Sequence, residues 1–176
     1  SNGSGYFGFN PLGHGTNHFT GTFDGKGFTI SNLYINRATQ DNVGLFGYIE
    51  KAAIKNIGLK NVNIIGFSQV GGLVGNNYYG TIENSYATGT VSGTGYFVGG
   101  LVGFNNFGTI SNSYSSGNVA GSHYVGGLVG HNKDGGTITN SYASGTVSGN
   151  HYLGGLVGYN SAGRIENSYA SGFVTG

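Results

Sequence analysis

The chain has no cysteine, methionine or tryptophan and only one proline, Pro11, among its 176 residues. The absence of cysteine excludes disulfide frameworks, thiolate zinc sites and thiol nucleophiles. Charged residues are also scarce: they form 7% of the chain, the formal net charge is +1, and residues 84–132 contain no Asp, Glu, Lys or Arg. Because binding to a phosphate backbone needs clustered Lys and Arg, we predict no nucleic-acid partner.

Long apolar runs are missing as well, because glycine or a polar residue interrupts every apolar segment within a few positions. No segment approaches the roughly 18 residues that a membrane helix requires, so we predict no membrane insertion. The chain starts at Ser1, without an initiator methionine or a signal peptide. We therefore expect a mature chain or an excised fragment.

Glycine, in contrast, is abundant, with 38 residues. This bias is typical of low-complexity chains, yet Leu, Ile, Val and Phe together form a quarter of the sequence, which is above the rough 20% floor of disordered compositions. A core can therefore form. Glycine is not at every third position, which excludes collagen, and it disfavours helices by about 1 kcal/mol at each interior position.

A repeat of 27 or 28 residues dominates the sequence. The pentapeptide Gly-Gly-Leu-Val-Gly begins at Gly71, Gly99, Gly126 and Gly154. Each copy is followed by a second block of the form Gly-x-Ile-x-Asn-Ser-Tyr, which begins at residues 80, 108, 136 and 163, and by a third block around a valine, at residues 91, 119, 147 and 174. A degenerate copy, Gly44-Leu45-Phe46-Gly47, precedes them. Repetition at such a period indicates a stacked repeat architecture.

The three short apolar blocks of each period predict three short strands, because they are rich in β-branched residues and are separated by Gly, Asn and Ser. Stacked periods place each strand about 4.8 Å from its counterpart, which gives three parallel sheets around one core. Parallel crossovers are right-handed in nearly all proteins. We therefore predict an all-β fold, a right-handed parallel β-helix (β-solenoid) of about six coils. A β-propeller blade needs about 40 residues, more than this period offers.

The stack converts sequence repeats into columns of equivalent residues. Two apolar columns are predicted to form the interior: Ile54, Ile82, Ile110, Ile138 and Ile165, and Leu45, Leu73, Leu101, Leu128 and Leu156. The column Asn56, Asn84, Asn112, Asn140 and Asn167 is expected to lie inward or at a corner, with amides bonded from coil to coil. At the paired glycines we expect a bend or a positive φ, and close approach between coils.

These blocks resemble the GLUG motif repeats of large secreted bacterial surface proteins, including filamentous-haemagglutinin-like adhesins and the flanking repeats of immunoglobulin A1 metallopeptidases. The segments Phe9–Gly13 and Phe19–Gly25 resemble the opening coils of such regions. The resemblance implies a secreted or cell-surface β-solenoid, often adhesive, and transfers no functional residue. We expect one continuous domain, with degenerate coils or a cap over 1–42 and GLUG-type repeats over 43–176 that end without a cap.

The sequence contains few groups of residues that are suited to catalysis or metal binding. His123 and His151 occupy equivalent places in adjacent coils, but two ligands alone make a weak metal site. The six carboxylates are scattered over different coils, whereas glycoside hydrolysis needs two of them roughly 5–10 Å apart. We predict no enzymatic activity, no cofactor, and no catalytic or metal-binding residues.

Aromatic residues form the candidate ligand or partner surface, since 13 Tyr and 11 Phe recur in register. Their columns could stiffen the stack, or bind a glycan, a host surface or a partner subunit. The candidate residues are Tyr86, Tyr114, Tyr142 and Tyr169 in one column, and Phe97, Tyr124 and Tyr152 in another.

We therefore predict a non-enzymatic structural or adhesive module of an extracellular bacterial surface protein, acting as a rigid stalk or as a glycan or host-surface binding unit. Two alternatives stay open. Uncapped coils could associate end to end into an extracellular filament. Two columns suggest an ice-binding face: Thr81, Thr109 and Thr137, or Thr90, Asn118 and Thr146. Arg164 interrupts the first and Asn118 the second.

Overall fold

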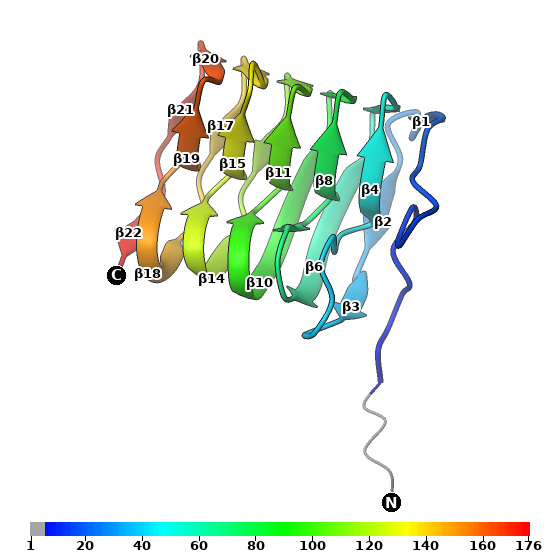
Figure 1. Cartoon of the computed structure of the whole chain (residues 1–176), viewed down its shortest axis with the longest axis horizontal. Coiled ribbons are helices and arrows are strands. Elements are labelled where there is room, and N and C mark those ends of the chain that lie inside the picture. Colours follow the sequence, from blue (N-terminus) through cyan, green and yellow to red (C-terminus); the bar gives the residue numbers. More distant parts are fainter. Residues whose placement is uncertain (1–5) are drawn as a thin grey trace, which may run out of the picture.

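The computed structural model describes residues 6–176; the first five residues of the predicted N-terminal unit lie outside it. The described chain folds into 22 strands and no helix. The strands pair in parallel from one coil to the next and form three sheets. Figure 1 shows the coils side by side along the long axis, from β1 at one end of the stack to β22 at the other. The predicted all-β solenoid of about six coils is confirmed; its right-handed sense stays a prediction.

Sheet 1 has six strands, which contain the predicted isoleucine column. Phe23 occupies the equivalent position in the first coil, and Ile54, Ile82, Ile110 and Ile138 follow in register, fully buried. Ile165 continues the register but is exposed, so the predicted interior position is wrong for this last member of the column. The strands are, in spatial order, β1 (Thr22–Asp24), β5 (Ala53–Lys55), β9 (Thr81–Glu83), β12 (Thr109–Ser111), β16 (Thr137–Thr139) and β20 (Arg164–Glu166).

Sheet 2 has five strands, each of which begins at or just after a glycine-leucine segment. The leucine column is buried from Leu45 to Leu128, which confirms its predicted interior position there, and it becomes partly exposed at Leu156 in the last coil. The strands are β4 (Phe46–Glu50), β8 (Val74–Tyr78), β11 (Val102–Asn106), β15 (Val129–Lys133) and β19 (Val157–Ser161).

Sheet 3 has eleven strands and includes the longest of the fold. Its members are β2 (Thr29–Ser31), β3 (Tyr34–Asn36), β6 (Gly58–Gly66), β7 (Val70–Gly71), β10 (Tyr86–Gly99), β13 (Tyr114–Ser115), β14 (Asn118–Gly126), β17 (Tyr142–Ala143), β18 (Val147–Gly154), β21 (Tyr169–Ala170) and β22 (Val174–Thr175). The column Ile64, Val91, Val119 and Val147 is buried and faces the common core.

The paired glycines allow close packing between sheets. All eight lie within the described residues, and none has φ in the left-handed region. A Cβ at Gly72, Gly127 or Gly155 would instead collide with the Cβ of an alanine in sheet 3, namely Ala87, Ala143 or Ala170. At Gly100 the opposing side chain is Ser115. A Cβ at Gly72, Gly100 or Gly127 would also collide with the carbonyl of the equivalent glycine in the next coil. The expected close approach between coils is therefore confirmed, whereas a positive φ is wrong for these positions.

Residues in the left-handed region mark the corners. The predicted Asn column lies at one such corner, with φ of 55° at Asn56 and 49° at Asn84, Asn112 and Asn140. Asn tolerates this conformation better than most residues, which explains its recurrence. Within this column, one hydrogen bond joins successive amides, from Nδ2 of Asn84 to Oδ1 of Asn56 (3.2 Å).

A ladder of asparagine side chains, buried except at its last member Asn160, runs along sheet 2, and the sequence patterns did not reveal it. Asn77, Asn105, Asn132 and Asn160 each donate to the carbonyl that ends their own turn, at 2.9–3.2 Å. Each of the first three also donates to the amide oxygen of the next, at 2.7–2.8 Å. The Oδ1 atom of Asn77 has no hydrogen-bond partner within residues 6–176, because Ile49 occupies the equivalent place in the preceding coil.

A second polar ladder consists of Ser85, Ser113, Ser141 and Ser168. Each hydroxyl donates to the carbonyl two residues earlier, at 2.7–2.8 Å. It also accepts a backbone N–H from the preceding coil, at 3.1–3.3 Å. In each Asn-Ser-Tyr block, Asn therefore forms a corner, Ser makes hydrogen bonds between coils, and Tyr places its ring on the outer face.

Candidate functional site

The first predicted aromatic column forms a continuous stack along sheet 3. Successive rings of Tyr86, Tyr114 and Tyr142 lie 4.8 Å apart and within 6° of parallel, and Tyr169 follows at 5.3 Å. Tyr86 also lies over Gly58, where a Cβ would collide with its ring. Burial, with smaller effects of Tyr142 and Tyr86, raises the pKa of Tyr114. The inner rings thus cover one another's faces and leave mainly edges to solvent.

The second predicted column lies at a corner. Phe97, Tyr124 and Tyr152 have φ of 63°, 55° and 53°, a conformation that is strained for bulky side chains. Their rings stack from coil to coil, with centroids 5.3 Å and 4.8 Å apart. Aromatic stacking contributes about 0.5–1.5 kcal/mol per pair, which offsets part of this backbone cost.

This column is continuous with a row on the outer face of sheet 2, which contains Phe104, His131 and Tyr159. We call the six residues Phe97, Phe104, Tyr124, His131, Tyr152 and Tyr159 the aromatic corner. Phe97 stacks on Phe104 at 5.1 Å, and Tyr124 lies 5.2 Å from Tyr159. Tyr152 and Tyr159 are 58% and 41% exposed.

His131 lies inside the aromatic corner and is only 7% exposed. Its Nε2 atom lies 2.7 Å from the hydroxyl of Ser161, and its Nδ1 atom is buried and has no hydrogen-bond partner in the described part of the chain. Burial, with a smaller effect of Lys133, lowers its pKa to about 4. His131 is therefore neutral near pH 7 and acts as an aromatic residue, like Phe104 and Tyr159 in the adjacent coils.

His123 and His151 come together on the outer face of sheet 3, as their equivalent positions in the repeat predicted. Their Cα atoms are register partners in β14 and β18, and their ring centroids lie 4.6 Å apart. The Nδ1 atom of His123 lies 2.8 Å from the hydroxyl of Ser122. Within residues 6–176, no three His, Cys, Asp or Glu side chains gather as a metal-binding group.

The carboxylates mostly pair with neighbouring basic groups. Asp24 lies 3.7 Å from Lys55, Asp134 lies 2.6 Å from Lys133, and Glu166 pairs with Arg164. A side-chain hydrogen bond from Asn56 and a backbone hydrogen bond from Lys26 lower the pKa of Asp24. A general acid needs the opposite shift, so Asp24 has the properties of a surface ion-pair residue.

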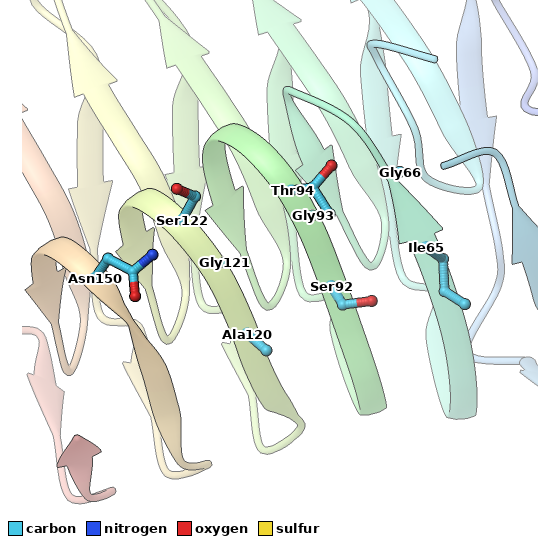
Figure 2. Close-up of a pocket in the computed structure, with 9 residues that line it drawn as sticks. All are labelled: Ile65, Gly66, Ser92, Gly93, Thr94, Ala120, Gly121, Ser122 and Asn150. Atoms are coloured by element: carbon cyan, nitrogen blue, oxygen red, sulfur yellow. The ribbon is translucent and has the colours of Figure 1, made fainter. Parts of the chain in front are cut away.

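A shallow groove of about 450 Å³ crosses the outer face of sheet 3. Figure 2 shows Ile65, Ser92 and Ala120 along one limb of the bent strands, and Thr94, Ser122 and Asn150 along the other. Gly66, Gly93 and Gly121 lie between the two rows. The groove has no charged lining residue, so it offers only hydroxyl, amide and small apolar groups to a ligand.

The threonine column lies on sheet 1. Thr81, Thr109 and Thr137 are register partners in successive coils, and Arg164 follows Thr137 in the last. The flat row of hydroxyls therefore extends over three coils before a charged side chain replaces it.

The comparisons with known proteins match the repeat. The family model of the GLUG motif matches residues 68–92, 94–120, 121–148 and 149–175. No solved structure is significantly similar. Across residues 6–176, no helix is long and apolar enough to cross a membrane.

Two curated relatives are similar over about half of the chain. Halomucin of Haloquadratum walsbyi is 44% identical over 90 residues, which are 49% of this chain and 1% of that protein. A protein of Evansella cellulosilytica, provisionally named a Gly-rich membrane protein, is 43% identical over 81 residues, or 44% of this chain and 9% of that protein. The chain therefore corresponds to a small part of each relative.

Proposed function

Because the chain belongs to the GLUG-motif family, we propose that it is a rigid, non-enzymatic β-solenoid module of a secreted or cell-surface protein. One observation carries this proposal: a single core runs through the stacked coils, and a ladder of hydrogen-bonded Asn side chains joins four successive coils. The names of the two relatives, a mucin and a membrane protein, support a surface location. Their much greater length supports the role of one module within a long protein.

Rigidity is the physical property that such a module supplies. The first and last coils lie at opposite ends of the stack (Figure 1). Six coils at about 4.8 Å each give the stack a length of roughly 30 Å along its axis. A flexible Gly/Ser chain of the same length would have a broad end-to-end distribution, with a root-mean-square value of roughly 70–80 Å. The module therefore fixes the distance between its two ends, which a flexible Gly/Ser linker would leave variable.

Single-molecule energy transfer between dyes at the two ends tests this role. We expect one narrow, short-distance population for the chain, and a broad population for a Gly/Ser linker of equal length. The chain in 6 M guanidinium serves as the unfolded control. A broad distribution for the native chain would overturn the proposal of a rigid spacer.

A second role, adhesion, is supported by the exposed rings of Tyr152 and Tyr159. These rings lie 5.8 Å apart in an edge-to-face arrangement, and open ring faces are the surfaces on which sugar rings and partner side chains pack. The test is a glycan array and a cell-binding assay with the Tyr152→Ser/Tyr159→Ser variant. Loss of binding with retained folding supports adhesion by the aromatic corner, and unchanged binding excludes it.

End-to-end self-association and ice binding stay predictions. Negative-stain microscopy across a concentration series tests the first, with fibres as the supporting result. Thermal hysteresis of the purified chain tests the second, and its absence would exclude the threonine column as an ice-binding face.

A further inference from the structure

We propose that His123 and His151 form a binding site for one divalent transition-metal ion, with Cu²⁺ preferred. The two imidazoles belong to adjacent parallel strands of sheet 3, their rings tilt by 34° to each other, and their centroids are 4.6 Å apart. His151 is exposed and His123 is half-buried. Both rings are therefore accessible to an ion from solvent, and they project from the same face.

The separation of the rings fits coordination to a single ion. With imidazole–metal bonds of about 2.0–2.1 Å, two rings whose centroids lie 4.6 Å apart can each place one nitrogen on a shared ion once the exposed His151 side chain turns its ring toward it. The square-planar and octahedral geometries of Cu²⁺ and Ni²⁺ accept two neighbouring imidazoles as ligands. Water would complete the coordination.

A neighbouring hydroxyl already orients one of the two ligands. The 2.8 Å contact between Ser122 Oγ and His123 Nδ1 leaves the Nε2 atom of His123 free. Metal-binding histidines usually engage their second ring nitrogen in this way, which fixes the ring orientation. In the adjacent coil the third member of the row is Tyr96, whose ring centroid lies 5.0 Å from that of His123.

The donor set determines which ions can bind. Two imidazoles without a thiolate or a carboxylate do not form the four-ligand site of structural zinc, and Ca²⁺ and Mg²⁺ prefer oxygen ligands. Cu²⁺ has the highest affinity among the first-row divalent ions for nitrogen ligands. No Lys or Arg occurs between residues 84 and 132, so no cationic side chain of that segment opposes the ion.

The ion would link two coils. Because it binds the folded chain through residues 28 positions apart, it stabilises the native state relative to the unfolded state by mass action. The link would join β18 to β14 and so hold the last coils of the stack together.

The experiment uses the chain without a histidine tag. Calorimetric titration at pH 7.5 should show one Cu²⁺ per chain, electron paramagnetic resonance should show two nitrogen ligands, and the melting temperature should rise with Cu²⁺ concentration. Ni²⁺ should bind more weakly, and Ca²⁺ should not bind. His123→Asn and His151→Asn should each weaken Cu²⁺ binding at least tenfold, and Ser122→Ala should weaken it by about tenfold.

His14→Asn is the matched control, since His14 is exposed and lies in the N-terminal segment; it should leave Cu²⁺ affinity unchanged. Far-ultraviolet circular dichroism verifies folding of every variant. Cu²⁺ affinity that survives His151→Asn, a one-nitrogen spectrum, or an unchanged melting temperature in excess Cu²⁺ would overturn the proposal.

Discussion

The side-chain amide of Asn105 donates from Nδ2 to Oδ1 of Asn132 at 2.8 Å, although 27 residues separate them. The same Nδ2 atom donates to the carbonyl of Gly108 at 3.0 Å, and Oδ1 of Asn105 accepts from Asn77 at 2.7 Å. Asn105 is fully buried. One side chain thus satisfies a turn within its own coil and links its two neighbouring coils.

Replacing this amide by an apolar side chain of similar size is expected to destabilise the fold strongly. Asn105→Leu leaves buried groups of Asn132 and Gly108 without partners, each at a cost of about 1–3 kcal/mol. We expect a loss of about 3 kcal/mol or more in the free energy of unfolding, measured by urea denaturation. Asn112→Ala, at the exposed corner with φ of 49°, should cost only about 1 kcal/mol. Equal losses would contradict the importance of the buried ladder.

Ser115→Ala is expected to stabilise the protein. The Ser115 hydroxyl is buried and has no hydrogen-bond partner among the described residues, and alanine occupies the same position in the adjacent coils, at Ala87 and Ala143. Removing an unsatisfied hydroxyl should raise the free energy of unfolding by about 1 kcal/mol. Ser113→Ala is the control: its hydroxyl makes two hydrogen bonds, so this change should destabilise. A lower urea midpoint for Ser115→Ala would disprove the prediction.

Gly100→Val is expected to prevent normal packing of sheets 2 and 3. A Cβ at this position would collide with Ser115 and with the carbonyl of Gly127, and overpacking of this kind costs about 1–3 kcal/mol or more. Gly135→Ala is the control for backbone strain without steric collision, because Gly135 has φ of 81° and open space around it. This change should lower the free energy of unfolding by about 1 kcal/mol. An unchanged melting temperature for Gly100→Val would refute the explanation.

His131 is expected to make stability depend on pH. Its folded-state pKa of about 4 lies below the ordinary value of 6.5, so the unfolded chain binds the proton more readily. The stabilisation is complete above about pH 6.5 and is lost progressively as the pH falls toward 4, with a total on the order of 3 kcal/mol. His131→Phe, which copies Phe104 of the adjacent coil, should remove this component. Identical pH profiles of unfolding for the two proteins would contradict the prediction.

The tyrosine stack is expected to contribute to stability rather than to binding. Tyr114→Ser/Tyr142→Ser removes three stacked pairs, each worth about 0.5–1.5 kcal/mol beyond burial. We expect a loss of roughly 3 kcal/mol in thermal or urea unfolding, with unchanged glycan or cell binding, because the inner ring faces are already covered. Reduced binding with unchanged stability would show that this column is the ligand surface.

The sequence by itself determined the repeat, the parallel stacking and most of the core columns. Strict repetition at 27 or 28 residues allows only equivalent residues to become neighbours, so Ile82 had to pair with Ile110. The contact between His123 and His151 followed from the same rule. These features depend only on register, which the period fixes.

The tertiary structure decided which polar residues are buried and which ring faces stay open. Leu73 and Val74, which are neighbours in the sequence, are both buried at the bend before the strand Val74–Tyr78. Inward and outward positions therefore do not simply alternate along this segment. The sequence pattern could not show that the side chain of Asn77, and not that of Asn76, faces the core. The offsets of 28, 27 and 28 between Asn77, Asn105, Asn132 and Asn160 were the available signal. The burial of His131 likewise depends on rings that come from another sheet. Side-chain direction at left-handed corners, and contacts between sheets, follow from the path of the backbone in three dimensions, which the period alone does not specify.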